Sequence, residues 1–376
     1  GDDDDAGDDD DSGDDDAGDD DDAGDDDDAG DDDAADDDDD TGDDDDTGDD
    51  DATSACLSVS TQQGMDFVKV CGGTFEMGCT AAQQNDGNCD ADESPAHNVT
   101  LTRDFWLSET EVTQGQWGAL FDDNPSYFGP VGGGTACGDD CPVELVNWFE
   151  ALEFLNAMSS AEGLPACYNL SGCTSDFLAG CAGGLGSCNV DTYNCSSVEV
   201  TSATGSPYDC QGYRLPTEAE WEFAARADAD QLYAGSDNLG TVGWYDDNSG
   251  STTQSAATLA PNEWGLYDMS GNVMEWTWDL YESSYYASSP DTDPQGPLSG
   301  VGRVYRGGHW STFSARSRVS YRGYIGGPEL RSSGIGIRPV RTISVDDDDA
   351  GDDDDAVDDD DTGDDDDSGG DDATSA

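Results

Sequence analysis

Apolar residues lie almost entirely in the middle of the chain, where their spacing predicts helices and strands. Residues 108–121 and 143–160 carry them at helical spacing, which predicts two amphipathic helices. In the second helix one face gathers Val146, Phe149, Leu152 and Leu155, while the acidic residues fall elsewhere, at Glu144, Glu150 and Glu153.

Local signals add one more helix and two strands. Residues 215–226 are predicted to be helical, because Thr217 can cap the helix and Glu220, three residues later, completes a capping box. The short pieces FVKV at 67–70 and RVYR at 303–306 have the composition of strands. The remainder is rich in Gly, Ser, Asn and aromatic residues, so we expect an α+β fold with little regular secondary structure.

The polar pattern of the two ends is different and divides the chain into three parts: 1–55, 56–344 and 345–376. Residues 1–47 and 345–368 repeat a hexapeptide, GDDDD followed by Ala, Ser or Thr, with one residue missing near Gly13. Each period offers four carboxylates, one glycine and one small residue. Such an array cannot build a hydrophobic core, so we expect extended Asp-rich tails around one globular domain.

Charge narrows the choice of partners. The chain has 89 acidic and 12 basic residues and a net charge of -77, with 34 aspartates between Asp2 and Asp51 and 18 between Asp346 and Asp372. Nucleic acids and anionic membranes need clusters of Lys and Arg, so neither is an expected partner. Cations are the natural partners of this chain.

The tails are predicted to bind many calcium ions, because calcium takes about 6–8 oxygen ligands in flexible geometry and carboxylates supply them. Four consecutive aspartates cannot all face one ion, so neighbouring segments would share ions. The first periods of each tail give the predicted ligands Asp2, Asp3, Asp4, Asp5, Asp8, Asp9, Asp10, Asp11, Asp346, Asp347, Asp348, Asp349, Asp352, Asp353, Asp354 and Asp355. The alternative is a solvated acidic spacer.

One sequence, DDATSA, ends both tails, at 50–55 and at 371–376. This repetition suggests either a shared assembly element, through which copies self-associate, or a unit that recurs in a longer polypeptide.

Twelve cysteines lie between residues 56 and 210, an even number at irregular spacing. No CxxC pair is matched with a second pair or with histidine, so a zinc site is not expected. Six disulfides are predicted, which places the protein outside the cytosol. They would use Cys56, Cys71, Cys79, Cys89, Cys137, Cys141, Cys167, Cys173, Cys181, Cys188, Cys195 and Cys210. No apolar run approaches the ~20 residues of a membrane span.

Seven blocks in the middle of the chain resemble the formylglycine-generating enzyme (sulfatase-modifying factor) family. In order they are GGTFEMG at 72–78, ETEVTQGQW at 109–117, PVELVNW at 142–148, YRLPTEAEWE at 213–222, GLYDMSGNVMEW at 265–276, RGGHW at 306–310 and GIGIR at 334–338. The resemblance spans nearly all of 66–342 and implies the family fold, a variant of the C-type lectin-like fold. The additional cysteines are similar to those of secreted bacterial members.

The resemblance does not extend to the catalytic cysteines. Active members of the family hold copper(I) with two cysteines spaced C-x4-C after the RGG block, and those places hold Thr312 and Ser317 here. A hydroxyl cannot replace a thiolate as a copper(I) ligand, so we expect no copper, no catalytic residue and no enzyme activity. His309 is expected to be a partly buried side chain beside Trp310 rather than an iron ligand.

The acidic residues of the third predicted helix could be read as a catalytic pair. Glu218, Glu220 and Glu222 are flanked by Arg214 and Arg226, so structural ion pairs and caps are the favoured interpretation.

The resemblance also implies a calcium loop. In the family this loop uses a side chain at the position of Asp268, backbone carbonyls at Gly271 and Val273, and the carboxylate at Glu275. The family's second calcium site would lie near residues 244–248, where Asp246, Asp247 and Asn248 offer oxygens. A surface turn with a salt bridge is the alternative for Asp268 and Glu275.

Together these features predict an extracellular or cell-surface calcium-binding structural protein. Its tails would join copies into a fibre, sheath or matrix, and its domain would be displayed or would bind a glycan or protein. Two alternatives remain: a metal-dependent oxidase of the formylglycine-generating type, and an acidic protein that acts on calcium minerals.

Overall fold

The computed structural model describes residues 56–84, 87–174 and 193–343. Both Asp-rich tails lie outside the described residues, and so do all the tail aspartates that are predicted to bind calcium, together with Cys181 and Cys188. The domain limits inferred from composition, at 56–344, stay a prediction.

A five-stranded antiparallel sheet divides the core of the domain. Its strands run in the order β1 (Val59–Gln62), β2 (Met65–Val70), β5 (Phe105–Ser108), β13 (Val340–Thr342) and β8 (Tyr213–Arg214). Side chains alternate between the two faces of a strand. In β2, Phe67 accordingly enters the core beneath α3 and α4, while Val68 and Val70 enter the core around α5.

The second sheet has four strands, and one of them contributes to the candidate site. Its order is β11 (Gly323–Ile325), β10 (Arg303–Arg306), β9 (Met274–Leu280) and β12 (Ile335–Gly336), and β12 runs parallel to β9. Two hairpins complete the strands: β3 (Thr74–Met77) with β4 (His97–Thr100), and β6 (Tyr168–Ser171) with β7 (Ser197–Val200). The strands predicted at 67–70 and 303–306 are confirmed.

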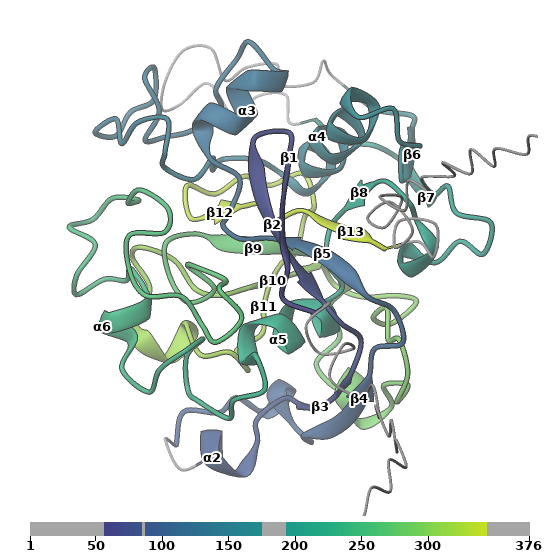
Figure 1. Cartoon of the computed structure of the whole chain (residues 1–376), viewed down its shortest axis with the longest axis vertical. Helices are drawn as coiled ribbons and strands as arrows, with labels where there is room; N and C mark the ends of the chain where they lie inside the picture. Colours follow the sequence, from purple (N-terminus) through teal and green to yellow (C-terminus); the bar gives the residue numbers. More distant parts are fainter. Residues whose placement is uncertain (1–55, 85–86, 175–192, 344–376) are drawn as a thin grey trace, which may run out of the picture. The chain divides into compact units, whose positions relative to one another are not determined.

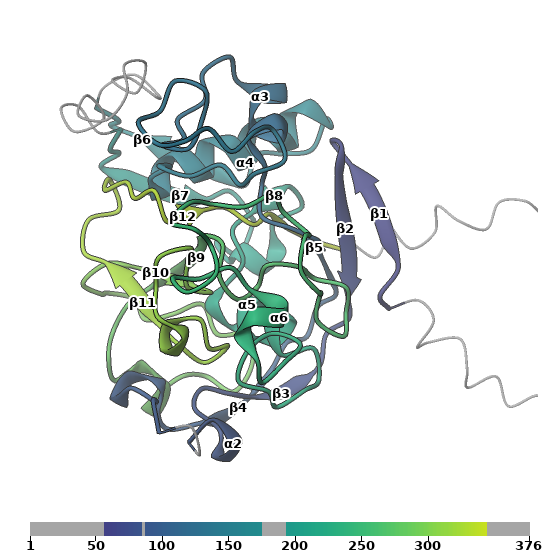
Figure 2. The ribbon, with the colours of Figure 1, turned by 90° about the vertical axis from the view of Figure 1, so that its left-hand side faces the viewer.

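The helices lie in separate places around these sheets. The α-helices are α2 (Ala81–Gln84), α3 (Gln114–Leu120), α4 (Trp148–Ala161), α5 (Glu218–Arg226) and α6 (Leu239–Val242), and the 3-10 turns are η1 (Ala91–Glu93), η2 (Pro207–Asp209), η3 (Tyr285–Ala287) and η4 (Ser314–Arg316). Figure 1 and Figure 2 both show α3 and α4 together at one end of the domain, with α2, β3 and β4 at the other.

Capping boxes set where the helices begin. The helix predicted at 215–226 is confirmed from Glu218 onward, because the Thr217 hydroxyl accepts from the Glu220 amide and the Glu220 carboxylate accepts from the Thr217 amide. The other two helices are shorter than predicted. Residues 105–108 form β5, and α3 begins only after its cap Thr113; α4 likewise begins after its cap Asn147. Apolar residues before these caps pack in extended segments that share the helical spacing by chance.

Two glutamates that the pattern placed away from the apolar face are fully buried. Glu144 accepts a hydrogen bond from the Phe128 amide at 2.8 Å, and Glu150 pairs with Arg331. The pattern did not indicate this burial, because the partners of both glutamates come from segments that helical periodicity does not describe.

Disulfides hold much of the irregular structure. Five are present among the described residues, namely Cys56–Cys71, Cys79–Cys89, Cys137–Cys141, Cys167–Cys210 and Cys173–Cys195. In the same residues no helix is both long enough and apolar enough to cross a membrane. The α+β architecture with little regular secondary structure is as predicted.

Candidate functional site

Residues 265–276 form a tight loop that leads into β9. Asp268, Gly271 and Asn272 all have left-handed backbone conformations, with φ of 56°, 101° and 54°. Asp and Asn tolerate this region better than most residues. At Gly271 a Cβ atom would lie 2.4 Å from the Trp244 carbonyl oxygen, so only glycine allows the neighbouring chain to pack this closely.

Asp268 is buried in this loop, and only one of its two carboxylate oxygens has a hydrogen-bond partner among the described residues. Its Oδ2 accepts a hydrogen bond from the Ala257 amide at 2.7 Å, while Oδ1 has no hydrogen-bond partner among the described residues. Burial raises the pKa of Asp268 to about 6. A buried carboxylate oxygen without a partner carries a desolvation cost, which a proton or a cation would offset.

Glu275 begins β9 and is already strongly hydrogen-bonded. Arg338 Nε lies 2.9 Å from both of its oxygens, and Trp221 Nε1 donates to Oε2 at 2.6 Å. Its charge is therefore largely countered inside the protein. Arg338 Nη2 also lies 2.8 Å from Oε1, so each oxygen of Glu275 has two donors and little acceptor capacity is left for an ion.

Glu111 joins this site from the segment before α3, and the sequence analysis did not single it out. It is fully buried; Oε1 accepts from the Val273 amide and Oε2 from the Asn272 side-chain amide, both at 3.1 Å. Burial, followed by the charges of Asp268 and Glu275, holds the pKa of Glu111 well above its usual range. Its position inside the ETEVTQGQW block was the one signal available.

The carboxylate cluster, as we call Glu111, Asp268 and Glu275, brings three buried acids to face one guanidinium, that of Arg338. Among the described residues, no backbone amide outside the sheet ladders donates to the carbonyl oxygens of Gly271 or Val273. The cluster thus offers an unpartnered carboxylate oxygen, two carbonyls and excess negative charge. That set fits a hard cation such as calcium, whose ligands are oxygens.

The second predicted calcium segment packs directly against this loop. The Asn272 amide donates to the Trp244 carbonyl at 2.8 Å. Asp246 and Asp247 are exposed, while Asn248 closes its own turn by accepting from the Tyr245 amide at 2.7 Å. The structure brings the two segments side by side without joining their carboxylates, so the second site stays a prediction.

The residues at the family's copper positions have other surroundings. Thr312 is buried, and its hydroxyl donates to the His309 carbonyl at 2.9 Å. The Ser317 hydroxyl is buried and has no hydrogen-bond partner among the described residues. His309 is half-buried with its ring 5.6 Å from that of Trp310, and burial lowers its pKa to about 4, as expected for a neutral packing residue.

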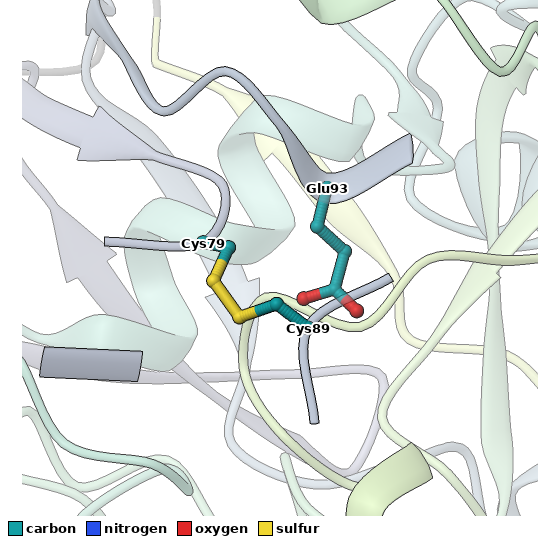
Figure 3. A group of neighbouring side chains, drawn as sticks. All are labelled: Cys79, Cys89 and Glu93. Carbon is teal, nitrogen blue, oxygen red and sulfur yellow. A yellow bond between two sulfur atoms is a disulfide. The ribbon is translucent and has the colours of Figure 1, made fainter. Parts of the chain in front are cut away.

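Among the described residues, one group of side chains has ligand atoms close enough together to resemble a metal site, and it is not the carboxylate cluster. Ligand atoms of Cys79, Cys89 and Glu93 lie within 4.8 Å of one another (Figure 3). The two sulfurs form a disulfide, which carries no thiolate charge, and Arg318 Nη2 pairs with the Glu93 carboxylate at 2.6 Å. This group therefore has no free ligand charge for a metal.

The acids of α5 form an arginine–glutamate network, which comprises Glu218, Glu222, Arg226, Arg306 and Arg322. Arg306 bridges Glu218 and Glu222 at 3.1 and 2.5 Å, and every member is buried. Glu220 pairs separately with Arg214 at 2.7 Å. The interpretation of these acids as structural ion pairs and caps is confirmed.

Comparisons with known proteins show what the chain is similar to. A family model described as the sulfatase-modifying factor enzyme 1-like domain matches residues 53–343. The chaperone protein LppX of Paenibacillus barcinonensis is 32% identical over 291 residues, which cover 72% of this chain and 88% of that protein. The formylglycine-generating enzyme of Streptomyces coelicolor is 31% identical over 290 residues, or 72% of this chain and 87% of that one.

A solved structure gives the same result for the fold. Variable protein 1 of Treponema denticola superposes with a TM-score of 0.62 at 32% identity, over 76% of this chain and 99% of that chain. The fold predicted from the seven sequence blocks is confirmed.

Proposed function

Because the chain belongs to the sulfatase-modifying factor enzyme 1-like family, whose domain spans residues 53–343, we propose that it is a non-catalytic, calcium-binding member that works outside the cell in display and assembly. The tails bind many calcium ions and join copies, and the domain is presented on the resulting fibre, sheath or matrix.

The observation that carries the calcium proposal is the unpartnered Oδ1 of Asp268. This oxygen would be the first ligand of a calcium ion, with the carbonyls of Gly271 and Val273 and the Glu275 carboxylate beside it. Calcium would supply the positive charge that three buried carboxylates facing one arginine lack. The tails, whose carboxylates are far more numerous, would take further ions.

The proposal of a non-catalytic domain rests on the positions of Thr312 and Ser317. Neither hydroxyl offers copper(I) the soft thiolate it requires. Family membership by itself does not choose an activity, since relatives of similar identity include a protein named as an enzyme and one named as a chaperone. The residues at the site, and not family membership, therefore support a non-catalytic domain.

Two other candidate functions each follow from a specific observation. Similarity to the Streptomyces coelicolor enzyme favours an oxidase. That function would require stoichiometric copper and conversion of a cysteine peptide to formylglycine. The tail aspartates favour an action on calcium minerals, which would change calcium carbonate or phosphate crystallisation in a way that a fibre-forming protein need not.

Terbium luminescence separates the domain's ion from those of the tails. Terbium(III) substitutes for calcium and emits when a nearby Trp is excited, and neither tail contains Trp or Tyr. We expect sensitised emission from the wild type that calcium competes away, and loss of most of it in Asp268→Asn. Asp291→Asn is the matched control, because Asp291 is exposed and its side chain has no hydrogen bond or ion pair with any described residue. Equal emission from both variants would overturn the calcium loop.

Assembly is tested independently by electron microscopy of the full chain before and after chelation. Fibres or sheets that dissolve on chelation are the expected result. Particles of one unchanged size in both conditions would contradict assembly and leave the tails as solvating spacers.

A further inference from the structure

Two adjoining cavities lie where β3 begins and α5 ends. Their volumes are about 220 and about 310 Å³, and Thr74, Phe223 and Asp228 line both. No residue of the carboxylate cluster lines either cavity.

Three aromatic rings form a continuous wall of these cavities. The ring centroids of Phe75 and Phe223 are 5.2 Å apart, and those of Phe223 and Trp264 are 5.0 Å apart in an edge-to-face arrangement. Phe75 and Trp264 are partly exposed. Gly73 keeps the space open, because a Cβ atom there would lie 2.9 Å from the Phe223 ring.

The charge of the lining is negative. Asp228 is exposed at the junction of the cavities and has no hydrogen bond or ion pair with any described residue. Arg226, the cation of the lining, is fully engaged, because it donates to Glu222, to the Gly78 carbonyl and to Asp230. Asp228 therefore keeps its full attraction for a positive ligand.

The backbone holds Asp228 in a left-handed turn. Ala227 and Asp228 are consecutive left-handed residues, with φ of 46° and 61°, directly after α5. Ala227 is the left-handed cap that ends α5, and Asp tolerates this region better than most residues. The turn places Asp228 in the lining of the same cavities as the aromatic wall.

Several hydrogen-bond donors in the lining are already occupied. The Thr74 and Thr100 hydroxyls bond to each other at 2.8 Å, and the Gly72 amide donates to Asp104 at 2.8 Å. Asp228 offers a charged acceptor, and the aromatic residues offer ring faces. Those are the features that recognise an organic cation.

We propose that these joined cavities bind an organic ammonium group on a short apolar stem, with Asp228 as its counter-ion and Phe75, Phe223 and Trp264 as its wall. The site would give the displayed domain its ligand class. It rests on the proposed function only for that role, since binding here requires neither calcium nor the tails.

Choline and 3,3-dimethylbutan-1-ol are matched probes, because they share shape and differ in charge. Saturation-transfer NMR on the full chain in calcium should detect choline, and titration should show the neutral alcohol binding about tenfold more weakly, as the loss of a charge–carboxylate and cation–π contact predicts. Asp228→Asn should weaken choline binding about fivefold, since an exposed ion pair contributes roughly that factor. Asn tolerates the left-handed turn, so the fold is kept.

Three controls make the test decisive. Asp291→Asn should leave choline affinity unchanged, Trp264→Leu should weaken it, and Asp268→Asn should leave it unchanged even if calcium binding is lost. The proposal is overturned if choline does not bind, if the neutral alcohol binds equally well, or if Asp228→Asn behaves like Asp291→Asn. Binding of glucose in place of choline would also overturn it.

Discussion

The arginine–glutamate network and the carboxylate cluster are both buried, both charged and both built around arginine, yet their charges balance differently. In the network, burial would raise the pKa of Glu222, but Arg226 and Arg306 outweigh it and the pKa is lowered. In the cluster one guanidinium faces three acids, and burial raises the pKa of both Glu111 and Asp268.

This contrast separates structural charge from functional charge. A buried ion pair in which every charge has its partner holds the fold in place and needs no further ligand. A buried acid that lacks a partner must take up a proton or an ion. We therefore expect the network to respond to mutation alone and the cluster to respond to calcium.

The largest effect should come from breaking the network at Arg306. Replacing it in Arg306→Met leaves Glu218 and Glu222 buried with fewer partners, which should lower the free energy of unfolding by about 3–5 kcal/mol. Urea unfolding measures this, with Arg316→Met as the control, because Arg316 is exposed. A network variant no less stable than the control would remove the distinction between the two regions.

Substitution of Glu144 should have the next largest effect on stability, because Glu144 is a buried acid with no ion-pair partner among the described residues. Burial raises its pKa to about 8, and its Oε2 has no partner among the described residues. The folded state thus holds a proton that the unfolded chain releases, so stability falls as pH rises from about 4.5 to 8.

Substitution by Glu144→Gln should remove this dependence, which amounts to on the order of 3 kcal/mol between pH 5 and pH 8. Chemical unfolding of both proteins across that range measures the difference. Parallel pH profiles for the two proteins would show that Glu144 is ionised in the folded state.

The effect of Asp268→Asn on stability should have opposite signs in calcium and in chelator. With chelator, Asp268→Asn removes an unpartnered buried charge and should be at least as stable as the wild type. At a calcium concentration of a hundred times Kd the wild type gains about 2.7 kcal/mol that the variant lacks. Thermal unfolding in both conditions checks this, and a variant that is less stable in both would make Asp268 merely structural.

Substitution of Arg103 should cause the smallest loss of stability, and it tests whether burial sets the cost of losing an ion pair. It pairs with Asp293 at 2.9 Å, but its side chain is 38% exposed. Arg103→Met should cost less than about 1 kcal/mol, and the cost should shrink further in high salt, unlike that of Arg306→Met. A loss equal to that of the network variant would mean that pairing, and not burial, sets the cost.

Much of the fold followed from short-range signals. Thr217 and Glu220 lie three residues apart, so their capping box could be predicted from propensity, and the seven sequence blocks identified the fold. The starts of α3 and α4 were missed because Thr113 and Asn147 were not recognised as caps, although their partners Gln116 and Glu150 also lie three residues away.

The site was predicted only in part. The resemblance singled out Asp268, Gly271, Val273 and Glu275, which the structure does gather in one loop. It did not show that Arg338 would bind Glu275, nor that Glu111 would complete the cluster. Nor did any pattern place Asp228 beside Phe75 and Trp264.

The sequence by itself determined the family, the helix capped by Thr217, the disulfide-rich character of the domain and the charge of the tails, because these follow from composition and from neighbours along the chain. Tertiary structure decided which acids are buried, which arginine each one meets and which remains without a partner. The free energy of a buried charge depends on groups brought close in space from distant parts of the chain, and that proximity is not encoded at any one position.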